Sequence, residues 1–388
     1  MHVAEGFGAV ADAFRRNFVD PGEDAAAVTV LHRGTRVVDL WGGTDVVNQR
    51  PMPEDALMMV ASCSKGVTAT VLAMLAERGV LDPEQRVAAY WPEFAAAGKD
   101  RVTVAMVASH TAGLPYPPVG TGLRGLDLHR GPGVTAALAA AAPLWEPGTA
   151  MAYHPVTYGT LLDEIVRRAS GHSISHHVRQ LIAEPLGVDL WIGLPEQHIH
   201  RVVPGLWHEA DPMQPNEEAP APGSYAALRQ QFLRENPPMD PDFDDPVETR
   251  EHYAAERPGI GAITDARALA TMYAALLAPV DGVRLIGEDT RTAATAPHTD
   301  HVETLVESGT TGPDIRFGLG YQLASPSMPG FGPASFGHTG AGGRLGIADP
   351  DYEVALAYLC SRMRNIGPQG DPRWRTLLDA VKQCLETS

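Results

Sequence analysis

The periodicity of apolar and polar positions changes twice along the chain. The first run, "MHVAEGFGAVADAFRRNF", predicts an amphipathic helix, and "AAVTVLHRGTRVVDLWGG" predicts a β-hairpin that turns at Arg33-Gly34. Residues 81–194 follow a mainly helical pattern with Pro/Gly loops between the helices. The C-terminal part returns to β-rich runs, "IRFGLGYQLA", "ASFGHTG", "RLGIADP" and "EVALAYLCSRM", and ends in a helix predicted over about 372–385.

This order of elements predicts an α+β fold with one sheet assembled from both chain ends and flanked by the terminal helices. We expect a sheet domain from residues 1–80 with 255–388, and an inserted, mainly helical domain over 81–254. Within the insertion, residues 209–251 hold 11 Asp or Glu and 8 Pro against three Arg. That composition predicts a solvated loop, and a lid over a pocket is the alternative.

The helix predicted over about 64–78 has one apolar stripe, formed by Val67, Val71, Met74 and Leu75. Gly79 stands where a C-cap glycine belongs, and Gly171 follows a later helix in the same way. Further along, Thr264 is the expected N-cap of "TDARALATMYAALLA". These residues set the expected limits of three helices.

A lysine stands at the start of the 64–78 helix, three residues after Ser62. Lysine is rare here, because 27 of the 30 basic residues are Arg and the lysines are Lys65, Lys99 and Lys382. Residues three apart share a helix face, so Ser62 and Lys65 can touch. A desolvated lysine can lose its proton, and the neutral amine can then activate a serine hydroxyl. The alternative is that Ser62 only caps the helix while Lys65 lies on the surface.

A second candidate segment is "WEPGTAMAYHPVTYGTLL", in which a turn delivers Tyr153 just before a helix. A nearby ammonium group can lower the pKa of a tyrosine hydroxyl and let it relay protons. The alternative for Tyr153 is a partly buried side chain bonded to the backbone. Tyr158 competes for the relay but lies inside the next helix, so we expect it in the core.

A third segment is "FGHTGAGGRLGIADP", where a strand ends in His338, Thr339 and Gly340. Ala341, Gly342 and Gly343 follow. Glycines let backbone N–H groups approach a ligand closely, which one half of an oxyanion hole requires. The alternative is an ordinary glycine-rich hairpin.

Composition narrows the class of protein. A net charge of −17 argues against nucleic-acid binding, which needs a basic face. No apolar stretch approaches about 18 residues, and the first residues do not read as a signal peptide. Cys63, Cys360 and Cys384 show neither disulfide nor zinc spacing, and Cys63 is expected to pack in the core. We therefore expect a cytoplasmic protein with no metal, cofactor, nucleic-acid or membrane partner.

Taken together, the three segments resemble the serine β-lactamase and penicillin-binding-protein superfamily, which carries S-x-x-K and a late K-T-G. The most similar group is the class C β-lactamase-like esterases, the family VIII carboxylesterases. The likeness covers nearly the whole chain and includes "VDLWGG", "MVASHTAGLP", "YHPVTYG" and "GHTGAGG". It implies a β-lactamase-like fold with an antiparallel sheet. It also implies that Ser62 is the acylated nucleophile, Lys65 its base and Tyr153 a proton relay.

The resemblance further implies an oxyanion hole made by the N–H groups of Ser62 and Ala341. The substrate site would include His154, His338, Thr339, Gly340, Gly342 and Arg344. The chain departs from the lactamases in two places: His154-Pro155 follows Tyr153 where they have Tyr-x-Asn, and His338 replaces the lysine of K-T-G. Both changes weaken recognition of a β-lactam and favour an ester. Arg344 stands where these esterases often have a small residue, and it is either a surface residue or a clamp on an anionic or bulky acyl partner.

The resemblance therefore implies hydrolysis of carboxylic esters through an acyl-enzyme, with a small-molecule acyl ester or amide as substrate. An acyltransferase of secondary metabolism would use the same residues with an alcohol or amine as acceptor. A β-lactamase or D-Ala peptidase fits less well, because those substrates lie outside the cytoplasm. A non-catalytic binding protein on the same fold is disfavoured by the intact Ser62, Lys65 and Tyr153. The sequence does not indicate the acyl group, the acceptor or the oligomeric state.

Overall fold

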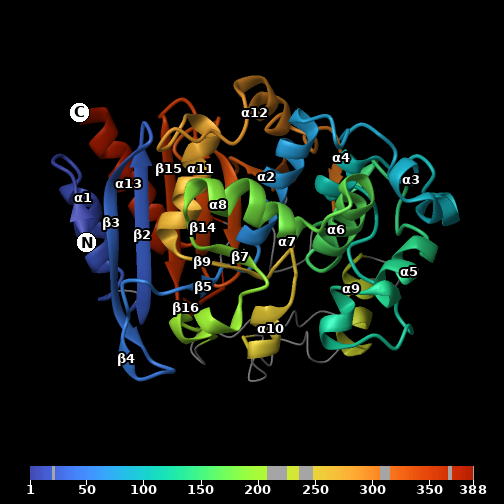
Figure 1. Ribbon diagram of the computed structural model, residues 1–388, viewed down its shortest axis with the longest axis horizontal. Helices are drawn as coiled ribbons and strands as arrows, with labels where there is room; N and C mark the ends of the chain where they lie inside the picture. The colour runs from blue at the N-terminus through green and yellow to red at the C-terminus, as the bar shows by residue number, and fades with distance from the viewer. Residues whose placement is uncertain (20–21, 208–224, 236–247, 306–314, 366–368, 388) are drawn as a thin grey trace.

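The structure is a computed structural model that describes residues 1–19, 22–207, 225–235, 248–305, 315–365 and 369–387. In this described part, the largest sheet has nine strands, all paired antiparallel (Figure 1). Its order is β1 (His2–Val3), β3 (Thr35–Asp45), β2 (Ala25–His32), β15 (Val354–Cys360), β14 (Arg344–Asp349), β13 (Phe336–Gly340), β12 (Gln322–Leu323) and β11 (Arg316–Phe317), with β4 (Arg50–Pro51) beside β3.

The two chain ends meet in the middle of this sheet. Strand β2 pairs with β15, so that Ala26 lies opposite Cys360 and His32 opposite Val354. The predicted hairpin is confirmed, because β2 and β3 are joined at Arg33-Gly34. The predicted α+β architecture, with one antiparallel sheet from both ends, is confirmed as well.

Helices cover both faces of the sheet (Figure 1). On one face, α1 (Gly8–Arg16) and α13 (Pro372–Thr387) share an apolar cluster with the strands, including Phe14, Leu356 and Trp374. On the other face, α2 (Cys63–Glu77) and α11 (Ala266–Leu277) pack into the main core. The terminal helices therefore flank the sheet as expected.

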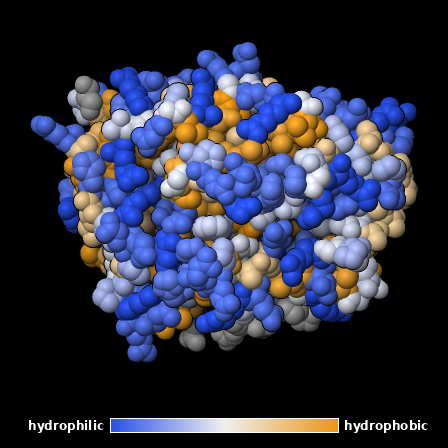
Figure 2. All heavy atoms as spheres, viewed as in Figure 1, coloured by the Kyte–Doolittle hydropathy of each residue, from blue (hydrophilic) through white to orange (hydrophobic). Residues whose placement is uncertain are grey.

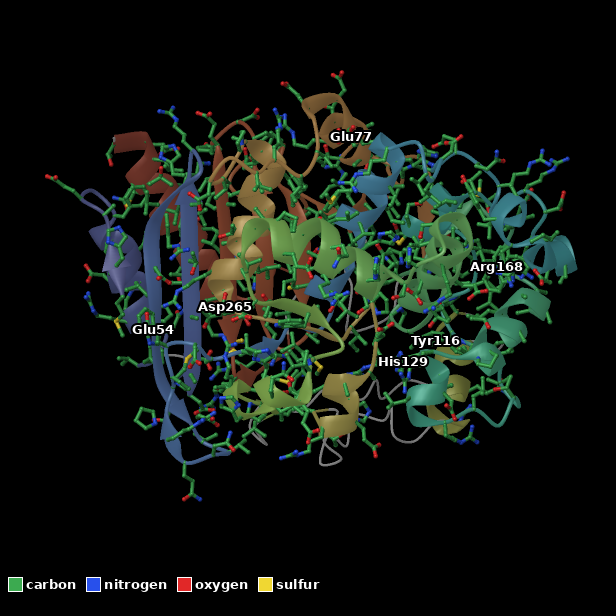
Figure 3. The ribbon with its side chains drawn as sticks, viewed as in Figure 1. Glu54, Glu77, Tyr116, His129, Arg168 and Asp265 are labelled. Atoms are coloured by element: carbon green, nitrogen blue, oxygen red, sulfur yellow. The ribbon has the colours of Figure 1, made fainter. Side chains whose placement is uncertain are left out.

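Helix α2 is buried on every side, not along one stripe. All residues from Cys63 to Leu75 are buried, because the helix runs between the sheet and the helical part of the molecule. A helix that is apolar all round is the expected form for such a position. It ends at Glu77, whose carboxylate accepts hydrogen bonds from the Gly287 N–H and the Thr290 hydroxyl next to α12 (Glu288–Ala294) (Figure 3). Gly79 follows with φ +68°, as predicted for a C-cap glycine.

The remaining elements lie mainly between α2 and α11 in the sequence. The helices are α3 (Val87–Tyr90), α4 (Val104–Ala108), α5 (Pro132–Ala140), α6 (Thr157–Ser170), α7 (Ile174–His177), α8 (Glu184–Leu186), α9 (Tyr225–Glu235) and α10 (Arg250–Ala254). Short helical turns are Pro92–Gly98, Gly125–Leu128, Val178–Ala183 and Glu196–Arg201. Small sheets pair β5 (Met58–Met59) and β7 (Leu190–Ile192) with β9 (Ala262–Thr264), β6 (Ala150–Met151) with β10 (Glu303–Thr304), and β8 (Leu206–Trp207) with β16 (Arg362–Met363). The division at residues 80 and 255 stays a prediction.

Two local expectations change. Thr264 ends strand β9 and does not cap α11; the cap is Asp265, whose carboxylate accepts a 2.7 Å hydrogen bond from the Ala268 N–H (Figure 3). The physical reason is that Thr264 is still paired in β9, opposite Met58 and Leu190, so the helix begins one residue later than expected. In the acidic segment, residues 225–235 form helix α9, while 209–224 and 236–247 lie outside the described residues.

The surface shown in Figure 2 is mostly hydrophilic, and apolar residues appear on it in small groups between polar ones. The three cysteines are buried and form no disulfide, and Cys63 packs in the main core as predicted. Among the helices that the structure describes, none has the length and apolar character needed to cross a bilayer.

Candidate active site

Two distant segments meet at the N-terminal end of α2. Ala61 has φ +46°, and this left-handed residue turns the chain into the helix with Ser62 at the N-cap position. The end of β13 lies against the same turn: a Cβ added to Gly340 would lie 2.4 Å from the Val60 carbonyl oxygen and 3.1 Å from Cys63 Sγ. Only glycine permits that approach, which brings the start of the Ala341 turn beside Ser62.

Lys65 is fully buried and points back at Ser62. Its Nζ lies 3.2 Å from Ser62 Oγ, 2.8 Å from the Gly259 carbonyl oxygen and 3.5 Å from the Pro155 carbonyl oxygen. The alternative that places Lys65 on the surface is therefore wrong. Ser64, one residue earlier, bonds instead to the Ala61 carbonyl oxygen and accepts the Ala262 N–H.

Burial lowers the pKa of Lys65 to about 7, because an ammonium loses its hydration in this position. A neutral amine has two N–H groups and one lone pair. The two carbonyl oxygens, of Gly259 and Pro155, can accept the N–H groups, which leaves the lone pair for the Ser62 hydroxyl. The geometry therefore suits proton transfer from Ser62 to Lys65.

Tyr153 is half-buried beside this pair. Lys65 Nζ lies 4.8 Å from the centre of its ring, and the ring stacks on Phe317 at 6.1 Å between centroids. Tyr158 is fully buried, and its hydroxyl donates to the Lys65 backbone carbonyl at 3.3 Å, so it is a core residue as predicted. Tyr153 is thus the tyrosine that borders the site.

His338 lies beside both Tyr153 and Phe317, with ring centroids 6.1 Å and 6.0 Å away. Its Nδ1 is 2.6 Å from the Thr339 carbonyl oxygen, so Nδ1 carries the proton and Nε2 is left as an acceptor. Burial and the nearby Lys65 lower the pKa of His338 to about 3. The residue that replaces the lysine of K-T-G is therefore neutral. The Thr339 hydroxyl donates to Gln322 Oε1 at 3.0 Å.

His154 is fully buried and bonded on both ring nitrogens. Nδ1 donates to the Ala152 carbonyl oxygen at 2.6 Å, and Nε2 accepts the Leu114 N–H at 3.0 Å. Its backbone N–H donates to Nδ1 of His110 at 3.1 Å. The predicted substrate contact therefore has no free ring nitrogen in this arrangement, and the contacts of His154 hold the loop that carries Tyr153.

The turn after β13 presents Ala341 to solvent and buries its other residues. Gly342 has φ +85° and directs its carbonyl oxygen to Arg373, away from Ser62. Arg344 is fully buried; Nη1 donates to the Ala341 carbonyl oxygen at 2.9 Å, and Nη2 lies 3.7 Å from Glu248 Oε1. The surface alternative for Arg344 is wrong, and its observed partners brace the turn.

Sequence reasoning missed the role of two residues. His110 has φ +65°, is fully buried and packs its ring 4.8 Å from that of Tyr153 and 4.4 Å from that of Phe317. A histidine next to "TAGLP" gave only a weak signal of a bend. Gly259, whose carbonyl accepts from Lys65, carries no recognisable motif, and only the fold reveals it.

The chain has relatives in both sequence and structure. The model of the Beta-lactamase family matches residues 12–380. Esterase/beta-lactamase LipL of Mycobacterium tuberculosis is 33% identical over 371 residues, which cover 92% of this chain and 81% of LipL. Among solved structures, a family VIII carboxylesterase superposes with a TM-score of 0.83 and 34% identity over 99% of both chains. EstA from Arthrobacter nitroguajacolicus Rue61a has a TM-score of 0.83 and 31% identity over 100% of this chain and 98% of its own.

The match spans almost the whole chain in sequence and in structure, and the resemblance found in the motifs is confirmed. The chain therefore belongs to the beta-lactamase family.

Proposed function

We propose that this protein is a serine carboxylesterase that hydrolyses small to medium neutral esters through an acyl-enzyme on Ser62. The observation that carries the proposal is the buried Lys65 amine, 3.2 Å from Ser62 Oγ and with its pKa lowered to about 7. Similarity to a family VIII carboxylesterase and to Esterase/beta-lactamase LipL supports the same class of reaction.

In acylation, the neutral Lys65 amine takes the Ser62 hydroxyl proton while Oγ attacks the ester carbonyl. Negative charge then develops on the carbonyl oxygen. Within the described residues, neither the Ser62 N–H nor the Ala341 N–H has a backbone acceptor, so both are available to stabilise that oxyanion. The half-buried Tyr153 is the group proposed to pass the proton to the leaving alcohol. In deacylation, the same groups activate water.

Neutral esters fit this site better than β-lactams with a carboxylate. The proposal rests on His338, whose neutral ring offers an acceptor where a lactamase offers a cation. It also rests on Pro155, which has no amide side chain and turns its carbonyl oxygen toward Lys65. A carboxylate would thus meet a lone pair at His338, not an ammonium group.

The pH profile tests Lys65 as the base. Because the amine acts only when deprotonated, kcat/KM for p-nitrophenyl butyrate should fall as the pH drops below about 7 and level off above it. The measurement is initial rate against pH from 5 to 9 with corrected p-nitrophenol absorbance. A profile that stays flat down to pH 5 would remove Lys65 from the role of base.

Tyr153→Phe tests the proton relay. This substitution keeps the ring that packs on Phe317 and removes only the hydroxyl, so kcat should fall by roughly 10²–10⁴-fold while the protein stays folded. Steady-state kinetics and a thermal melt measure the two effects. Tyr158→Phe is the matched control, because its hydroxyl bonds only to the Lys65 backbone carbonyl among the contacts described. A loss of twofold or less in Tyr153→Phe would make Tyr153 a packing residue.

Intact-mass labelling tests the nucleophile. Wild-type protein mixed with p-nitrophenyl esters of graded length should gain one acyl group, and Ser62→Ala should gain none and lose hydrolysis. Ser64→Ala is the matched control on the same helix turn, since its hydroxyl is bonded away from the site. Substantial hydrolysis by Ser62→Ala contradicts the assignment. Acyl transfer to an added alcohol at the expense of free acid would favour the acyltransferase alternative.

The preference for esters over β-lactams tests the proposed role of the neutral His338 ring. We expect kcat/KM for nitrocefin to be at least about 10-fold below that for the best p-nitrophenyl ester, because a lost charged hydrogen bond alone costs about 1.5–3 kcal/mol. Parallel steady-state assays on one enzyme preparation give the ratio. Equal values for the two substrates would overturn the ester preference.

A further inference from the structure

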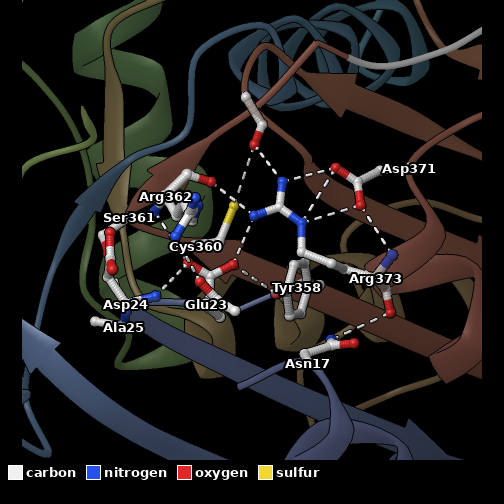
Figure 4. Close-up of polar contacts among 12 residues, drawn as sticks. Asn17, Glu23, Asp24, Ala25, Tyr358, Cys360, Ser361, Arg362, Asp371 and Arg373 are labelled. Atoms are coloured by element: carbon white, nitrogen blue, oxygen red, sulfur yellow. Dashed lines mark hydrogen bonds and ion pairs between the residues drawn. The ribbon is translucent and has the colours of Figure 1, made fainter. Parts of the chain in front are cut away.

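A group of buried charges lies behind the turn that joins β13 and β14. We name it the Arg373 cluster, and it consists of Glu23, Asp371 and Arg373 (Figure 4). The three side chains are at most 1% exposed. Glu23 precedes β2, while the other two stand at the start of α13, so the cluster joins both chain ends on the side of the turn away from Ser62.

Every N–H group of the Arg373 guanidinium has an acceptor. Nε donates to Asp371 at 3.0 Å, and Nη1 donates at 2.6 Å to Glu23 Oε2 and at 2.6 Å to the Arg362 carbonyl oxygen. Nη2 donates to Asp371 at 2.7 Å and to the Gly342 carbonyl oxygen at 2.7 Å (Figure 4). The planar guanidinium is thus held on two sides by carboxylates, and one Nη2 N–H points to the Gly342 carbonyl oxygen in the turn.

The turn packs directly on this guanidinium. A Cβ added to Gly343 would lie 2.1 Å from Arg373 Nη2 and 2.3 Å from Asp371 Oδ2, so glycine is required at this position, where φ is +104°. Moving the guanidinium would therefore move the turn.

Two peptide units connect Arg373 to the proposed oxyanion hole. The Gly342–Gly343 peptide accepts from Arg373 through its oxygen and donates its N–H to the Gly340 carbonyl oxygen at 3.1 Å. That oxygen belongs to the Gly340–Ala341 peptide, whose own N–H is the Ala341 donor. The C=O and N–H of a trans peptide point in opposite directions. The Ala341 N–H is therefore the far end of a chain that begins at Arg373.

We propose that Arg373, fixed by Glu23 and Asp371, is a positioning residue that orients and polarises the Ala341 N–H for the oxyanion. The inference rests on the proposed function. A cation at one end of a hydrogen-bond chain polarises each following bond, and a low-dielectric interior strengthens this effect. Arg344 donates to the Ala341 carbonyl oxygen, which belongs to the next peptide, so it braces the turn but is not a member of this hydrogen-bond chain.

A purely structural role would be to fasten α13 to the sheet. It would explain the two carboxylates, since Asp371 also accepts the Arg373 N–H at the helix start. The two roles differ in their consequences. If Arg373 only fastens α13, its loss lowers the stability of the fold. If Arg373 polarises the hydrogen-bond chain, its loss weakens the Ala341 N–H as a donor to the substrate.

Two variants test whether Arg373 polarises the Ala341 N–H. The triple variant E23Q/D371N/R373M removes the cation without leaving an unpaired buried carboxylate, which would threaten folding. Arg373→Lys keeps the charge but loses the planar guanidinium. We expect the triple variant to lose about 10- to 100-fold in kcat per titrated active site with KM within about threefold, below the 10²–10³-fold cost of losing an oxyanion donor outright. Arg373→Lys should lie between it and the wild type.

A spectroscopic measurement separates donor strength from stability. In an acyl-enzyme made with a ¹³C-carbonyl ester, the carbonyl stretch should move to higher wavenumber in both variants, because a weaker donor polarises the carbonyl less. Lys99→Met is the matched control: Lys99 is a buried lysine that donates to the Ala96 and Ala139 carbonyl oxygens far from the turn, and its loss should lower stability without shifting the stretch.

Wild-type kcat and an unshifted carbonyl stretch in either folded variant would overturn the proposal that Arg373 polarises the Ala341 N–H. Ester hydrolysis that persists in Ser62→Ala would instead overturn the proposed function, which the Arg373 variants cannot do.

Discussion

The candidate site depends on the burial of the Lys65 amine. Lowering the pKa of Lys65 from 10.5 to about 7 means that burial raises the free energy of the charged form, relative to the neutral form, by about 5 kcal/mol. The cause of that shift is burial, on a helix that is buried on all sides. The Gly259 and Pro155 carbonyl oxygens come from two separate loops and hold the amine in place beside Ser62. The apolar character of α2 is therefore a chemical requirement as well as a packing one.

Around this amine the structure arranges groups that stay neutral. His110, His154 and His338 are buried, and burial lowers the pKa of each, so none adds a positive charge that would compete with proton uptake by Lys65. Charge is instead kept behind the turn after β13, in Glu23, Arg373 and their partners. The neutral histidines thus lie on the Lys65 side of the turn after β13, and the buried charged residues lie behind that turn.

The sequence revealed the parts of the site that depend on short spacing. Ser62 and Lys65 are three residues apart on one helix, and the sheet followed from β-rich runs at both ends. Contacts that span the fold were out of reach, because no local pattern indicates them: the Gly259 carbonyl at Lys65, and the burial of Arg344 beside Glu248. Thr264 was the expected cap of α11, but it is still paired in strand β9, so Asp265 caps the helix one residue later.

The pairing of β2 with β15 also governs how the protein comes to be active. Ser62 lies in the N-terminal part of the sequence, while Ala341 and Arg373 lie far along it, and β15 must pair with β2 across more than three hundred residues. Such long-range pairing is intrinsically slow, because the loop must close before the contacts form. A folding intermediate in which β2 and β15 have not yet paired would therefore lack the proposed oxyanion hole, and the candidate site is complete only when these two strands have joined.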